Sequence, residues 1–165
     1  MLRENKTSKT GAGTAKFTIV ASEYNSTYVN AMVQAAQAEL KRAGAKQIQI
    51  LRVPGAFEIP VVAARLARLS QHATRNTQHG PFAAIICLGV ILRGETVHAA
   101  HIGEAVSRAL MEIQLRYEIP VIHEVLLLEN EQQARVRCLG RKHNRGAEAA
   151  QTALAMARLM TKLPG

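Results

Sequence analysis

Aspartate and tryptophan are both absent from this 165-residue chain, and all 12 of its acidic residues are Glu. Mechanisms that depend on Asp are therefore excluded, among them an EF-hand calcium loop, an aspartic dyad and a kinase-type magnesium site. Aromatic residues make up only 4% of the sequence and do not alternate with basic residues. A nucleic-acid surface that stacks bases on aromatic rings is thus poorly supported.

Cysteine and long apolar runs are also scarce. The two cysteines, Cys87 and Cys138, lie far apart in apolar stretches, which excludes a C-x-x-C motif and predicts reduced thiols in a core. No run reaches the about 18 apolar residues of a membrane span, and the N-terminus lacks the apolar segment of a signal peptide. We expect a cytoplasmic protein with no membrane partner.

Basic residues are in excess, with 21 Lys and Arg giving a formal charge of +9. Part of this charge lies in residues 1–15, which are polar and predict a flexible basic tail. The remaining residues, 16–165, have the length of a single domain. An excess of this kind favours nucleic acid, an anionic surface or a phosphorylated substrate as partner.

Short apolar runs alternate with segments of helical periodicity along the whole domain. Strands are predicted at 17–21, 47–53, 82–89 and 120–126, and helices at 26–43, 58–70, 97–117, 129–139 and 144–162, with a polar loop at 71–81. Strict alternation predicts a parallel sheet with right-handed crossovers. We therefore expect an α/β, three-layer flavodoxin-like fold, in which a four-stranded parallel sheet has helices on both faces and ligands bind at the carboxyl ends of the strands.

The segment 89–96 (GVILRGET) imitates a phosphate-binding loop between a strand and a helix. The motif requires Lys where Glu95 stands, and a carboxylate there would repel a nucleotide's phosphates. The free N–H groups at the start of the helix still suit a single phosphate. The alternative is a plain turn in which Thr96 caps the helix.

Two histidines follow this turn. His98 lies in the first turn of the predicted helix, where a side chain that titrates near neutrality can transfer protons. The alternative is an ordinary surface histidine. His98 and His101 have the spacing of metal ligands, but the sequence shows no third ligand, so no metal is predicted.

Three further segments could serve a site. Five cations at 135–145 predict a phosphate clamp, a solvated loop or a nucleic-acid contact. Tyr24 follows the first strand and could stack on a planar ligand or be buried. Gly55 and Ala56 follow the second strand and allow close approach of a ligand, and Glu58 could accept hydroxyl hydrogen bonds or stabilise a helix terminus.

Together these segments resemble the 6,7-dimethyl-8-ribityllumazine synthase family, which acts in riboflavin biosynthesis. The matching stretches are SEYN (22–25), VPGAFEIP (53–60), LGVILRGETVH (88–98), IPVI (119–122) and RCLGRKHNRGAEAA (137–150). The resemblance implies condensation of 5-amino-6-(D-ribitylamino)uracil with 3,4-dihydroxy-2-butanone 4-phosphate, giving the lumazine, phosphate and water. It implies no cofactor and no metal.

The resemblance also implies roles for individual residues. His98 matches the proton-transfer residue and Arg137 the phosphate-binding Arg, while Arg145 matches a basic residue that is usually Lys. His123 matches a pocket position, commonly Phe, contributed by the neighbouring subunit. The remaining positions match residues that hold the pyrimidine and its ribityl chain (Tyr24, Ala56, Phe57, Glu58, Val90, Ile91 and Leu92) or the phosphate (Glu95 and Thr96).

The family assembles as pentamers with sites between subunits, and some members form shells of sixty subunits. We expect such a homo-oligomer here, with riboflavin synthase as a candidate partner and no nucleic acid. Ala99 and Ala100 depart from the aromatic residue and Asp that often follow the site histidine. These departures keep open a catalytically weak relative that binds flavin or lumazine or forms only a shell, and a basic nucleic-acid-binding module is the third hypothesis.

Overall fold

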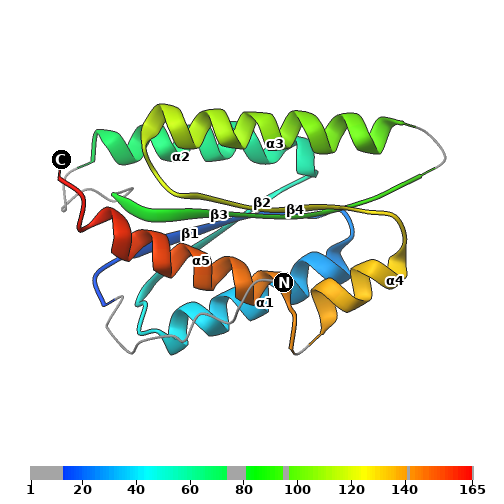
Figure 1. The fold of residues 1–165 in the computed structure, drawn as a ribbon, viewed down its shortest axis with the longest axis horizontal. Coiled ribbons are helices and arrows are strands. Elements are labelled where there is room, and N and C mark those ends of the chain that lie inside the picture. The colour runs from blue at the N-terminus through cyan, green and yellow to red at the C-terminus, as the bar shows by residue number, and fades with distance from the viewer. Residues whose placement is uncertain (1–12, 74–80, 95–96, 141, 165) are drawn as a thin grey trace.

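The computed structural model of this chain describes residues 13–73, 81–94, 97–140 and 142–164. A parallel sheet of four strands separates two layers of helices (Figure 1). The predicted three-layer α/β fold is therefore confirmed. The predicted tail falls largely on residues 1–12, and most of the polar loop falls on 74–80, all outside the described residues.

The strands pair in the order β2-β1-β3-β4, and every pairing is parallel. Their bounds are β1 Lys16–Ser22, β2 Gln47–Val53, β3 Phe82–Leu92 and β4 Val121–Leu128. The chain leaves β1 toward one edge of the sheet and then returns to the other side of β1 to form β3. This reversal makes the carboxyl ends of β1 and β3 the place where a sheet of this kind binds ligands.

The helices divide between the two faces of the sheet (Figure 1). Helices α1 (Ser26–Arg42) and α5 (Arg145–Met160) cover one face together with the short α4 (Glu131–Ala134) and the π-helical turn η2 (Arg135–Leu139). Helices α2 (Ile59–Gln71) and α3 (His98–Tyr117) cover the other. A 3₁₀ turn, η1 (Ala56–Glu58), precedes α2.

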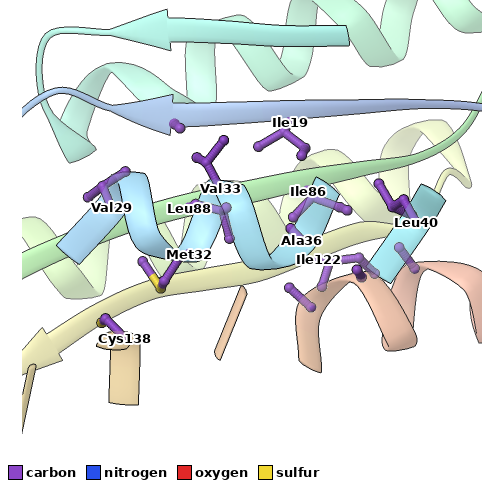
Figure 2. Packing of buried hydrophobic residues seen from close by; sticks show 14 of the residues in the cluster. Ile19, Val29, Met32, Val33, Ala36, Leu40, Ile86, Leu88, Ile122 and Cys138 are labelled. Carbon is purple, nitrogen blue, oxygen red and sulfur yellow. The ribbon is translucent and has the colours of Figure 1, made fainter. Parts of the chain in front are cut away.

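Successive side chains of each central strand point alternately into the hydrophobic cores on the two faces of the sheet. In β1, Ile19 and Ala21 pack toward α1 and α5, whereas Val20 packs toward α2 and α3. Figure 2 shows Ile19 and Ile86 of the sheet near Val33 and Ala36 of α1, while Met32 points toward Cys138. Since both faces are covered, the central strands must be apolar throughout, which explains the continuous FAAIICLG run.

Small residues bring α5 close to α1. The buried face of α5 consists largely of alanines, as the Ala-rich sequence predicted. A Cβ atom at Gly146 would overlap the main-chain carbonyl of Met32 in α1. This close approach fixes where α5 begins, and with it the position of Arg145.

Several predicted boundaries were wrong. β3 continues to Leu92 because its pairing with β4 runs to Leu92 and Leu128, so the turn does not begin at Gly89. The segment 129–139 is two short elements, α4 and η2, rather than one α-helix. Both cysteines are free and buried, as predicted. None of the described helices is long and apolar enough to span a membrane.

Candidate functional site

A cavity of about 810 Å³ opens at the carboxyl end of the sheet. It is built from the segments that follow β1 and β2, the end of β3 and the first turns of α3. The lining residues are Tyr24, Asn25, Gly55, Ala56, Phe57, Glu58, Val90, Ile91, Leu92, Gly94, His98, Ala99, His101, Ile102 and Ala105. We call these residues the pocket, and they include eight of the predicted site residues.

Asn25 joins two walls of the pocket. Its backbone is left-handed, with φ 54°, a conformation that asparagine tolerates better than most residues. Its side-chain amide donates a hydrogen bond to the Val90 carbonyl oxygen at 2.7 Å. The end of β1 is therefore tied to β3, and this bond holds the neighbouring Tyr24 at the mouth of the pocket.

Two aromatic side chains are exposed at this mouth. Tyr24 is 73% and Phe57 61% exposed, so the alternative that Tyr24 is a buried core residue is wrong. Large apolar rings left in solvent beside a cavity are a feature of ligand sites rather than of a monomer's core. Both rings are placed to cover a flat ligand.

The 3₁₀ turn η1 brings Glu58 back over the preceding loop. A Cβ atom at Gly55 would lie 2.7 Å from Glu58 Oε2 and 3.5 Å from Tyr24 Cδ2. The Glu58 carboxylate thus lies where a side chain at position 55 would stand, while Gly55 itself lines the pocket. Glycine here serves to place an acceptor group beside the tyrosine ring.

The end of β3 forms the floor of the pocket. Val90 and Ile91 are buried and Leu92 is half-buried. Arg93 turns away from the pocket and forms an ion pair with Glu129, with both carboxylate oxygens within 3.0 Å of Nη1. Glu95 and Thr96 lie outside the described residues. The N-cap position of α3 is occupied by Val97, not by Thr96 as the alternative had it.

His98 and His101 stand in the first turn of α3, exposed and facing the pocket. α3 is the next helix after β3 in the chain, and its first turn presents both imidazoles to the same cavity as Tyr24 and Glu58. Within the described ranges, no group of three or more His, Cys, Asp or Glu side chains could hold a metal ion. Proton transfer is the chemistry that these two side chains can provide.

A second polar cluster lies beyond β4 and is separate from the pocket. We call Glu124, Arg137, Cys138, Arg145 and Glu148 the β4 cluster. Arg145 at the start of α5 forms ion pairs with Glu124 at 3.0 Å and with Glu148 at 2.6 Å.

Burial raises the pKa of the Glu124 carboxyl, and attraction to Arg145 and Arg137 opposes this rise. The thiol of Cys138 has its pKa raised to about 11 by burial and by the Glu124 charge. The guanidinium of Arg145 thus lies between the carboxylates of Glu124 and Glu148. Arg137 is exposed and forms no ion pair with a described residue.

His123 also lies outside the pocket, on the edge strand β4. Its Nε2 atom is 2.7 Å from Ser107 Oγ in α3. Ile102 and Ala105 of α3 line the pocket, whereas Ser107 lies on the flank that faces β4. One chain thus holds its pocket and its His123 on opposite flanks of α3 and does not bring them together.

The sequence reasoning gave no role in these two regions to Asn25, His101 or Glu124. Asn25 and His101 line the pocket, and Glu124 anchors the β4 cluster. The sequence could have indicated Glu124, because this residue is a carboxylate within the largely apolar run IPVIHEVLLL. A charge at a buried position requires a partner.

The fold and the pocket define a doubly wound α/β protein with a small-molecule site at the carboxyl ends of β1, β2 and β3. The sequence model of the 6,7-dimethyl-8-ribityllumazine synthase family matches residues 14–161. The chain belongs to this family.

Two curated relatives carry the same name, 6,7-dimethyl-8-ribityllumazine synthase. The protein of Stenotrophomonas maltophilia (strain R551-3) is 38% identical over 152 residues, covering 91% of this chain and 92% of its own. The protein of Xanthomonas campestris pv. campestris (strain B100) is 39% identical over 153 residues, covering 92% of this chain and 93% of its own. The similarity thus extends over nearly the whole length of each protein.

Proposed function

We propose that this chain is a transferase of riboflavin biosynthesis that makes 6,7-dimethyl-8-ribityllumazine from 5-amino-6-(D-ribitylamino)uracil and 3,4-dihydroxy-2-butanone 4-phosphate. The proposal rests on the pocket of this chain, which belongs to the lumazine synthase family. In it, an exposed tyrosine, a carboxylate and a histidine from three separate segments meet at one cavity.

The pyrimidine substrate suits the pocket as built. A flat ring can stack on Tyr24 while its edge lies along the main chain of β3 at Val90 and Ile91. The ribityl hydroxyls then reach the segment 56–58, where the Glu58 carboxylate accepts hydrogen bonds. Apolar walls with a few polar groups that fix orientation are typical of small-molecule sites.

The phosphate substrate needs a cation that the pocket lacks. None of the described lining residues is Lys or Arg. Arg137 of the β4 cluster is exposed, and a guanidinium binds phosphate through two parallel hydrogen bonds. We infer that Arg137 of a neighbouring copy completes the site.

The reaction depends more on positioning the two substrates than on strong catalytic groups. The 5-amino group adds to the ketone, water leaves, phosphate is eliminated and the ring closes. Holding two reactants in order can lower a barrier by about 7–11 kcal/mol. His98, at the pocket mouth, transfers protons in these steps.

The same division of the site supports assembly. His123 and Arg137 can act on a pocket only if a second copy presents them, which favours a ring in which each chain serves its neighbour. We propose the pentamer, with the sixty-subunit shell as the larger alternative, and light scattering distinguishes the two. Association with riboflavin synthase and a cytoplasmic location stay predictions.

The phosphate role of Arg137 is tested by comparing Arg137→Ala with Arg135→Ala. Arg135 lies in the same turn and forms an ion pair with Glu131 at 3.5 Å. Loss of a hydrogen bond to a charged group costs about 1.5–3 kcal/mol, so Arg137→Ala should raise the KM for the phosphate substrate about 10–150-fold, with little change in the KM for the pyrimidine. Arg135→Ala should leave both KM values near wild type. An unaltered KM in Arg137→Ala would remove it from the phosphate site.

A further inference from the structure

The imidazole of His123 has a defined partner at each ring nitrogen. Nε2 is 2.7 Å from Ser107 Oγ, and Nδ1 accepts a hydrogen bond from the Val125 main-chain N–H at 3.2 Å. Because β4 is the edge strand of the sheet, this N–H would otherwise be left without a strand partner. The ring is therefore held by α3 on one side and by its own strand on the other.

The hydrogen bonds of Ser107 determine where the ring proton lies. Its Oγ is 2.7 Å from the Gly103 carbonyl oxygen, one turn earlier in α3. A hydroxyl has one hydrogen, and a carbonyl can only accept, so that hydrogen is donated to Gly103. Ser107 must then accept from His123 Nε2–H.

The second nitrogen leads independently to the same assignment. Since Val125 N–H is a donor, His123 Nδ1 must present a lone pair. A neutral imidazole with its proton on Nε2 satisfies all three contacts at once. An imidazolium would place Nδ1–H against the Val125 N–H, donor against donor, and lose that hydrogen bond.

The surroundings offer little to stabilise an imidazolium. On α3, Glu104 is next to Gly103 and Arg108 is next to Ser107 in the sequence. These two charged residues pair with each other at 3.0 Å. On β3, the neighbour of His123 is Cys87, whose buried thiol has a raised pKa. Glu124, the next residue of β4, is paired on the opposite face of the sheet. His123 is exposed in the single chain, but partial burial of its ring lowers its pKa and outweighs a backbone hydrogen bond that raises it, in agreement with the neutral form.

We propose that Ser107 is a positioning residue that holds His123 as a neutral, fixed ring with its proton on Nε2, and that this ring is the flat wall one subunit presents to the pyrimidine bound in the next subunit's pocket. The second part rests on the proposed function. With both nitrogens occupied by protein groups, His123 offers the substrate a ring face and no proton. It therefore replaces an apolar aromatic side chain, and His98 remains the proton-transfer residue.

A double-mutant cycle tests the link to the substrate. Removing one hydrogen bond changes an equilibrium by about three- to tenfold, so Ser107→Ala should raise the KM for the pyrimidine by that factor while kcat stays within about twofold. Ser107→Thr, which keeps the hydroxyl, should retain the wild-type KM. In a His123→Phe background, where the ring needs no such bond, Ser107→Ala should have no effect.

Two outcomes would overturn the proposal. An equal rise in KM in both backgrounds would mean that Ser107 acts through the fold and not through His123. No rise in either background would mean that the ring needs no support.

The protonation state is measured separately, without activity. Hydrogen–deuterium exchange at the imidazole C2 position, followed by mass spectrometry, gives the pKa of each histidine in a large assembly. The pKa of His123 should lie below 6.5 in the wild-type protein. A wild-type value at or above 6.5 would refute the neutral ring even if the enzyme is active, whereas a protein that makes no lumazine but shows the low value would refute only the proposed function.

Discussion

Two variants that each damage a different half of the proposed site should restore activity when they assemble together. His98→Ala removes the proposed proton-transfer residue from the pocket, and Arg137→Ala removes the proposed phosphate-binding cation from the β4 cluster. These halves lie apart within one chain. If each working site joins the pocket of one copy to the β4 cluster of the next, a mixed ring contains some sites in which both halves are intact.

The size of the effect follows from this geometry. In a random equal mixture, about one interface in four pairs an intact pocket with an intact cation. General acid–base residues contribute at least tenfold to rate, so His98→Ala alone should retain about 1–10% of wild-type activity. Arg137→Ala alone should retain at most a similar share at low phosphate substrate. The mixed assembly is therefore expected to reach about a quarter of wild-type activity, above either parent.

The assay co-expresses the two variants with different affinity tags and purifies assemblies that carry both. Initial rates are measured with the phosphate substrate below its KM, beside each variant alone and a mixture made after separate assembly. A co-assembled activity equal to the mean of the two parents would show that each site is complete within one chain, and would refute the shared site.

Three further predictions concern single positions. His98→Ala should lower kcat about 10–100-fold, whereas His101→Ala, a histidine that lines the same pocket, should change kcat by less than about threefold because the family resemblance gives proton transfer to His98 alone; equal effects would contradict that assignment. A Cβ at Gly146 would lie 2.5 Å from a main-chain carbonyl carbon of α1, while one at Gly103 would meet only leucine side-chain atoms at 3.5 Å or more. Thermal denaturation should therefore show Gly146→Ala destabilised by about 1–3 kcal/mol and Gly103→Ala neutral or stabilised by up to about 1 kcal/mol, and similar Tm values for the two would be inconsistent with the close packing of α5. Because burial raises the pKa of Glu124 above 4.5, the native state holds this proton more tightly than the unfolded chain, and stability falls as pH rises through 4.5. The Tm of Glu124→Gln relative to wild type should increase between about pH 4 and pH 7, and a constant or falling difference would count against this.

Local patterns were enough to predict the layers of the fold. The run FAAIICLG predicted a central strand because only residues apolar on both faces fit between two layers of helices. The periodicity of α1 and α3 predicted helices whose buried residues agree with the structure. The positions of the pocket residues followed in turn, since parallel strands bring their carboxyl ends to one edge of the sheet.

Local sequence patterns could not predict contacts between segments that are far apart in the sequence. The extension of β3 to Leu92 depends on pairing with β4, and the placement of Tyr24 depends on the bond from Asn25 to the Val90 carbonyl. The contact between His123 and Ser107 likewise joins two elements that only the folded chain brings together. Each depends on a partner that no local pattern specifies.

The central claim is that this chain condenses the two substrates into 6,7-dimethyl-8-ribityllumazine. The most direct measurement mixes purified protein with both substrates and follows the absorbance and fluorescence of the lumazine together with the release of phosphate. We predict that lumazine and phosphate form together, at a rate proportional to protein concentration and well above the uncatalysed rate. A rate that does not exceed the uncatalysed one would contradict the account and leave a non-catalytic member of the family.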